Sequence, residues 1–167
     1  MYRNKKAQMW ISDFIIGFLI FTSGLILASR FIFNSMQDNN FAEVRMGAET
    51  ISEYFLSEGV PSYWTNETVV RIGLTTNNRL NLTKLSYFYN MSYDDTRTYL
   101  STKYDYIVFF KNSTSTMNLS SGCGQGAIQP TDCDYDISGI VSDNFVKLSR
   151  YTIHNNSIIE MVLYVWD

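Results

Sequence analysis

The stretch Lys5-Lys6-Ala7-Gln8-Met9-Trp10-Ile11-Ser12-Asp13 passes from basic to apolar residues and continues into an uncharged run, Phe14 to Ser29. Between Trp10 and Phe33 there are 24 residues, of which only Asp13 and Arg30 carry charge. A helix of that length measures about 36 Å at 1.5 Å per residue, which exceeds a hydrocarbon core of roughly 30 Å. The sequence therefore predicts a transmembrane helix over residues 8–33.

The charges beside this helix indicate its orientation. Arg3, Lys5 and Lys6 precede it, so we expect a cytoplasmic leader, residues 1–7, and everything after Phe33 outside the cell. The alternative is a cleaved secretory signal cut after Ala28, but the apolar region of such signals has only 7–15 residues. The continued run to Phe33 and the acid at Asp13 favour a retained anchor.

The same residues resemble a known family. Lys5-Lys6-Ala7-Gln8 followed by Ser12-Asp13-Phe14 is similar to the class III signal peptide of archaeal type IV pilin-like proteins. The resemblance implies that a prepilin peptidase cuts between Ala7 and Gln8 and leaves the apolar helix on the mature protein. It also implies a long N-terminal helix, half in the membrane and half under a globular head, that assembles with like subunits.

Further residues resemble a stretch found in poorly characterised archaeal members of this group. They are Glu58-Gly59-Val60-Pro61-Ser62-Tyr63-Trp64-Thr65, Arg71-Ile72-Gly73-Leu74 and Asn81-Leu82-Thr83-Lys84-Leu85. This second similarity supports the family and says little about activity.

Asp13 is the single acid inside the predicted span. A carboxylate there costs on the order of 2.5–3.5 kcal/mol unless it is paired or reaches water. Cleavage before Gln8 creates an α-amine one and a half turns away. In type IV pilins, as the resemblance implies, the acid of one subunit pairs with the amine of its neighbour, so we expect Asp13 to act in assembly. The alternative is an acid that faces headgroups at the cytoplasmic boundary.

After the span, the pattern changes to an amphipathic helix over residues 34–58. Its apolar residues recur at spacings of three and four, and Gly59 and Pro61 end it; they are Phe41, Val44, Ala48, Ile51 and Phe55. The resemblance implies that this half supports a head domain, residues 59–167.

The head has the patterns of an α+β fold. Residues 69–74 and 104–110 are β-branched and aromatic, which predicts strands, and residues 145–153 and 158–166 predict a terminal hairpin. Residues 83–91 and 94–100 predict short helices, the second with a capping box at Ser92 and Asp95. We therefore expect a long N-terminal helix packed against an antiparallel β-sheet.

Two chemical features fit a domain outside the cell. Cys123 and Cys133 enclose a loop rich in turn residues and predict one disulfide, worth somewhat under about 3 kcal/mol in the entropic account. Six N-glycosylation sequons all follow the span, which makes them candidate glycan acceptors: Asn66, Asn81, Asn90, Asn112, Asn118 and Asn155.

The sequence offers no sign of an enzyme, cofactor or metal site. It contains no phosphate-binding glycine loop, Gly-x-Ser-x-Gly, His-Glu-x-x-His or calcium loop, and its one histidine, His154, lies in a predicted turn. Asp94 and Asp95 are explained by a helix N-terminus. A net charge of −3 argues against nucleic acid as a partner.

We therefore predict a membrane-anchored, type IV pilin-like surface subunit, a minor pilin of a filament or pseudopilus with a head used for contact or adhesion. Its partners would be the lipid bilayer, like subunits and the prepilin peptidase. The alternative is a single-pass surface glycoprotein that does not polymerise and acts as a binding module.

Overall fold

The computed structural model describes residues 5–120, 122–128, 133–135 and 137–167, and in its first helix it describes the side chains of 11–33 and 40–56. Residues 1–4 of the predicted leader lie outside the described residues. The chain divides into two compact units, Met1–Asn40 and Phe41–Asp167. Helix α1, Lys5–Leu56, contributes residues to both units.

In the first unit, three hydroxyl side chains within the apolar part of α1 bond to their own helix. The hydroxyl of Thr22 donates to the carbonyl of Phe18 (2.8 Å), that of Ser23 to Leu19 (2.7 Å) and that of Ser29 to Ile26 (2.9 Å). Such bonds satisfy hydroxyls where no water is present. These three hydroxyls therefore do not oppose burial of the helix in lipid.

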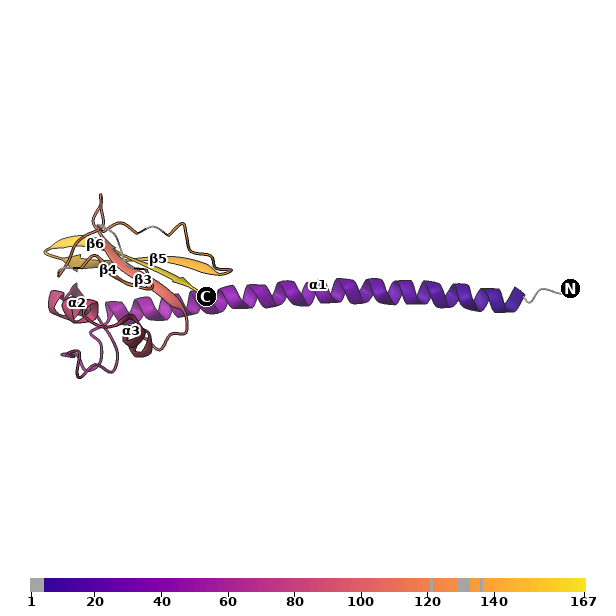
Figure 1. The fold of residues 1–167 in the computed structure, drawn as a ribbon, viewed down its shortest axis with the longest axis horizontal. Helices are drawn as coiled ribbons and strands as arrows, with labels where there is room; N and C mark the ends of the chain where they lie inside the picture. Colours follow the sequence, from indigo (N-terminus) through magenta and orange to yellow (C-terminus); the bar gives the residue numbers. More distant parts are fainter. Residues whose placement is uncertain (1–4, 121, 129–132, 136) are drawn as a thin grey trace. The chain divides into compact units, whose positions relative to one another are not determined.

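The second unit is an α+β domain with one six-stranded sheet (Figure 1). The strand order is β1-β2-β5-β6-β3-β4, and every pairing is antiparallel except a single parallel one between β2 and β5 at Arg79 and Ile153. The strands are β1 Thr75–Thr76, β2 Arg79–Leu80, β3 Asp105–Lys111, β4 Gly124–Gly126, β5 Phe145–His154 and β6 Ser157–Trp166.

The predicted terminal hairpin is confirmed as β5 and β6. Asn155 and Asn156 form its two-residue turn, with φ values of 47° and 60°. Two consecutive left-handed residues match the right-handed twist of the flanking strands, and asparagine tolerates this conformation better than most residues. The strand predicted at 104–110 is likewise present as β3.

The two short helices are also confirmed, as α2 Leu82–Tyr89 and α3 Tyr93–Tyr99. Asn81 caps α2, because its side chain accepts hydrogen bonds from the backbone N–H groups of Thr83 and Lys84. Ser92 caps α3 through the N–H of Asp95 (3.1 Å). The hydroxyl of Ser92 in turn donates to the carboxylate of Asp95 (2.7 Å). This pair is a variant of the predicted capping box.

The strand predicted at residues 69–74 is wrong. This segment forms only an isolated bridge, between Val60 and Arg71. The N–H of Leu74, the last residue of the segment, instead donates to the carbonyl of Phe55 in the last turn of α1 (2.9 Å). The N–H of Thr75 donates to the carbonyl of Ser57, just after that helix (3.1 Å). The last carbonyls of a helix lack partners within it, and here this segment supplies them.

The last turns of α1 enter the core of the second unit. Val44, Ala48, Ile51 and Phe55 are at most 1% exposed, as their spacing predicts. Phe41, which was expected on the same face, is 46% exposed. The core covers the helix only from Val44 onward, so the apolar pattern extends one turn beyond the surface that buries it.

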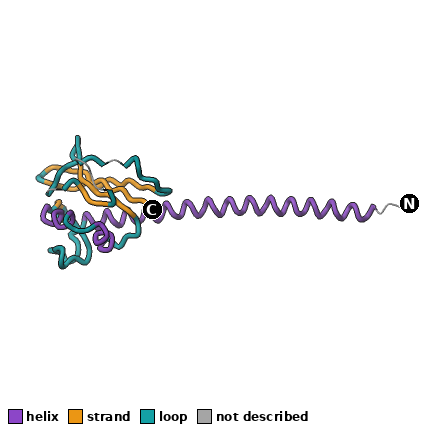
Figure 2. The backbone as a smooth tube through the Cα atoms, viewed as in Figure 1, coloured by secondary structure: helices purple, strands orange, loops and turns teal. Residues whose placement is uncertain are grey.

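Within this unit the sheet is covered on both faces (Figures 1 and 2). On one face, α2, α3 and the last turns of α1 pack against Tyr106, Met161 and Leu163. On the other face, a long connection between β4 and β5 covers Phe109, Tyr164 and neighbouring side chains. The apolar residues of this connection are Ile128, Tyr135, Ile137 and Ile140.

Candidate functional site

The most prominent surface of the first unit is apolar. Residues Ile11–Phe33 are long and apolar enough to cross a membrane, and none of this window is buried within the protein. Phe14 is 72% exposed, Phe21 65% and Phe31 80%. Soluble proteins do not display this much continuous apolar surface, because its exposure to water is unfavourable. The segment therefore has the properties of a membrane anchor or a signal sequence.

Asp13 is the third residue of this segment, and its side chain is exposed. Lys6, Ala7 and Gln8 belong to the first turns of α1, in the part where side chains are not described. On an α-helix, positions five apart are separated by about 7.5 Å along the axis and about 140° around it. A new amine at Gln8 would thus lie on nearly the opposite side of the helix from Asp13.

The predicted disulfide is present between Cys123 and Cys133, whose Cα atoms are 5.1 Å apart. Cys123 lies between Gly122 and Gly124, and a Cβ on either glycine would collide with a tyrosine, Tyr89 for the first and Tyr135 for the second. Tyr135 also stacks on Phe109, with ring centroids 4.5 Å apart. The disulfide therefore ties the residue before β4 to the connection between β4 and β5, which covers the second face of the sheet.

Burial raises the pKa of both the Tyr89 and the Tyr135 hydroxyl above the ordinary tyrosine value. Neither hydroxyl has a hydrogen-bond partner among the described residues. Both side chains are therefore neutral, and they pack against the two glycines that flank Cys123.

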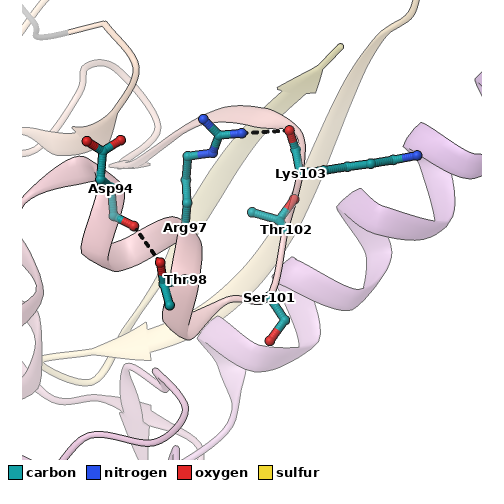
Figure 3. Close-up of a pocket in the computed structure, with 6 residues that line it drawn as sticks. All are labelled: Asp94, Arg97, Thr98, Ser101, Thr102 and Lys103. Carbon is teal, nitrogen blue, oxygen red and sulfur yellow. Dashed lines mark hydrogen bonds between the residues drawn. The ribbon is translucent and has the colours of Figure 1, made fainter.

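A shallow depression of about 460 Å³ lies between α3 and the start of β3 (Figure 3). The residues that line it are polar or charged and include two cations, Arg97 and Lys103. Both are already paired: Arg97 donates to the carbonyl of Lys103 (2.6 Å) and lies 3.5 Å from Asp105, and Lys103 lies 3.3 Å from Glu43. The depression therefore provides little unpaired positive charge for an anion.

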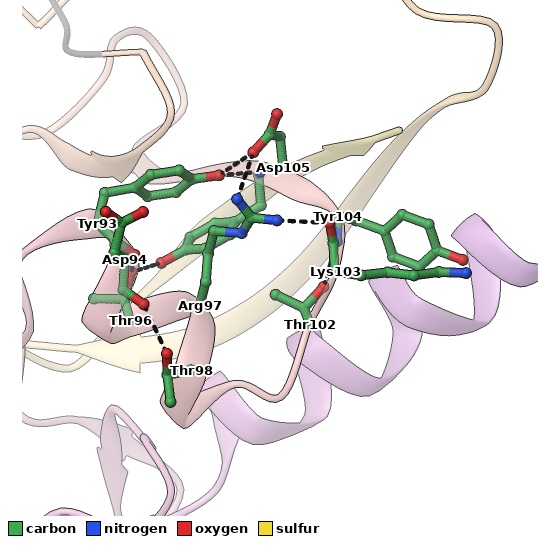
Figure 4. Close-up of polar contacts among 10 residues, drawn as sticks. Tyr93, Asp94, Thr96, Arg97, Thr98, Thr102, Lys103, Tyr104 and Asp105 are labelled. Atoms are coloured by element: carbon green, nitrogen blue, oxygen red, sulfur yellow. Dashed lines mark hydrogen bonds and ion pairs between the residues drawn. The ribbon is translucent and has the colours of Figure 1, made fainter.

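Figure 4 shows that the residues around this depression form a structural network. Tyr93 donates to the carboxylate of Asp105 (2.8 Å) and accepts from the N–H of Tyr106 (3.2 Å), and Tyr106 donates to the hydroxyl of Thr96 (2.5 Å). Burial raises the pKa of Tyr93 and of Tyr106, so both remain neutral donors. The network joins α3 to β3.

The six sequons all lie in the second unit, in different environments. Five acceptor side chains are exposed, whereas Asn81 is half-buried at the start of α2. His154, at the end of β5, lies opposite Ser157 and contributes to no cluster of possible metal ligands. The described residues contain no group of three His, Cys, Asp or Glu side chains that could hold a metal ion.

We compared the chain with protein families, curated proteins and solved structures, and found no match in any of the three.

Proposed function

We propose that this protein is a membrane-anchored surface subunit that assembles through its N-terminal helix, in the manner of type IV pilin-like proteins. The observation that carries this proposal is the segment Ile11–Phe33, an exposed apolar helix with one acid at its third position. The head, residues 59–167, would face the outside and make surface contacts.

A lipid environment accounts for the segment in two ways. It covers the exposed apolar side chains, and it requires polar side chains to bond within the helix, as Thr22, Ser23 and Ser29 do. Arg30, near the other end, is placed to extend its charged group to the headgroups.

Asp13 supports assembly in particular. After cleavage before Gln8, the new amine of the same chain would lie about 140° around the helix from Asp13. An amine from an adjacent helix can approach the carboxylate directly. Asp13 would therefore gain most from a neighbouring subunit, because pairing removes much of the cost of a charge near the apolar core.

Proteolysis of intact cells tests this topology. A protease added outside should remove the head and leave a membrane-protected fragment that contains residues 11–33. An abundant cytoplasmic protein in the same cells serves as the control and should stay intact until the cells are permeabilised. A full-length chain that survives in intact cells and is cut after permeabilisation would reverse the proposed orientation.

A further inference from the structure

Sequons are acceptors only where an oligosaccharyltransferase can reach and bind them. The enzyme needs the amide nitrogen Nδ2 of the asparagine, an accessible middle residue and the hydroxyl of the third residue. The six sequons of this chain differ in all three respects.

Two of the asparagines lie at helix ends, where their side chains already form hydrogen bonds. Asn81 caps α2 through Oδ1, and its Nδ2 donates to the hydroxyl of Thr76 (3.1 Å). The Nδ2 of Asn90 donates to the carbonyl of Ser86 (2.9 Å), and the sequon's third residue, Ser92, caps α3. In both asparagines Nδ2 already donates to an oxygen of the protein, so the reacting nitrogen is less available to the enzyme.

The sequon at Asn118 is held by its other two residues. Leu119 is buried, and its backbone exchanges two hydrogen bonds with Gly122 (2.8 and 3.0 Å). The hydroxyl of Ser120 donates to the carbonyl of Leu82 (2.9 Å). Although Asn118 itself is exposed, its sequon cannot be lifted from the surface without breaking these contacts.

The sequons at Asn66 and Asn155 are exposed, but each is engaged. The hydroxyl of Thr68 accepts from the N–H of Thr65 (2.9 Å) and lies 3.2 Å from the hydroxyl of Thr65, so its hydrogen bonds are with Thr65. Asn155 lies in the β5–β6 turn, where Arg79 donates to the side chain of the middle residue, Asn156 (3.0 Å).

Asn112 differs from all of these. Residues 112–115 are exposed and form a short loop after β3, closed by a bridge between Lys111 and Thr116. Oδ1 of Asn112 accepts from the backbone N–H groups of Thr114 (2.9 Å) and Ser115 (2.8 Å) and from the hydroxyl of Thr114 (3.0 Å).

These bonds fix the orientation of the amide. The atom that accepts from two backbone N–H groups must be the oxygen, so Nδ2 is the other atom. Nδ2 of Asn112 forms no hydrogen bond to a described residue. The hydroxyl of Thr114, which the enzyme recognises, already donates to Oδ1 of Asn112.

We infer that Asn112 is the principal N-glycan acceptor of this chain. In the reaction, Nδ2 attacks the anomeric carbon of a lipid-phosphate-linked oligosaccharide. The new N–C bond forms as the C–O bond to the phosphate breaks, Nδ2 loses a proton to the enzyme, and the lipid phosphate leaves. This inference rests on the proposed outward topology of the head.

The test is mass spectrometry of the full chain purified from its native membranes, with electron-transfer fragmentation to assign the modified asparagine. Asn118→Gln is the matched control for Asn112→Gln, because it removes the same chemistry six residues away. We expect Asn112→Gln to lose one whole glycan mass and Asn118→Gln to lose none. Thr114→Ala should abolish occupancy at Asn112, whereas Thr114→Ser and Ser113→Ala should retain it.

An Asn112→Gln variant that keeps the full glycan mass of the parent would overturn the inference. The redox state of Cys123 and Cys133, measured by alkylation of the same sample before reduction, separates the two proposals. An unmodified Asn112 with oxidised cysteines overturns the acceptor assignment alone. An unmodified Asn112 with two free thiols overturns the outward topology as well.

Discussion

Replacement of Asp13 with alanine is expected to abolish assembly and to leave membrane insertion intact. Removal of a carboxylate this near the end of the segment makes insertion easier, by less than the roughly 2.5–3.5 kcal/mol that an acid costs at the centre of a span. The same change removes the only acid within Ile11–Phe33 that could bind a neighbour's amine. Membrane fractionation should therefore show normal amounts of protein, while sheared filaments or cross-linked oligomers should lose the variant entirely.

Asp13→Glu is the matched control, since it keeps the charge on a side chain one methylene longer. We expect it to retain part of the assembly that Asp13→Ala loses. If the alanine variant assembled as the parent does, the pairing role of Asp13 would be wrong.

The second prediction concerns the stability of the core in which the last turns of α1 pack against the sheet. Phe55 is fully buried, with its ring centroid 5.3 Å from that of Phe88 and 6.1 Å from that of Tyr106. Phe55→Ala should lower the free energy of unfolding by about 3–5 kcal/mol, because it removes apolar burial and leaves a cavity. Urea unfolding of the full chain in mild detergent, followed by tryptophan fluorescence, measures this change.

Phe41 provides the control on the same helix. It is 46% exposed, so Phe41→Ala should cost less than about 1 kcal/mol. Equal losses in the two variants would contradict the burial of α1 from Val44 onward.

The elements predicted correctly are those whose signals are local. The β5–β6 hairpin has two strand-like runs separated by asparagines that tolerate left-handed φ, and α3 has its cap at Ser92. The burial of Val44, Ala48, Ile51 and Phe55 follows from their spacing. Cys123 and Cys133 were paired correctly because the chain offers no other cysteine.

The errors arise where tertiary contacts override local preference. The β-branched residues of segment 69–74 suit a strand, yet the N–H of Leu74 at its end bonds to the last turn of α1. The network of Tyr93, Arg97 and Asp105 was missed, since nothing in a seven-residue helix shows which strand it will contact. The connection over the outer face of the sheet was also missed, although Ile128, Ile137 and Ile140 gave an apolar signal within a turn-rich segment.

The sequons show the same division between pattern and geometry. The sequence favours three acceptors at predicted loop tips, Asn112, Asn118 and Asn155. Hydrogen bonding then distinguishes Asn112 from the other two. Asn81 and Asn90 were expected to be poorer acceptors because they flank a predicted helix, and Asn81 does cap α2 with the side chain that a glycan would need.

The mass of the mature chain in its native membranes is the most direct test of the central claim, that α1 is retained as an anchor and assembly helix. If the proposal is right, the polypeptide, after removal of any glycan, starts at Gln8 and keeps Ile11–Phe33. A chain that starts near Ser29 would have lost this segment as a secretory signal, and it would contradict both the anchor and the assembly role.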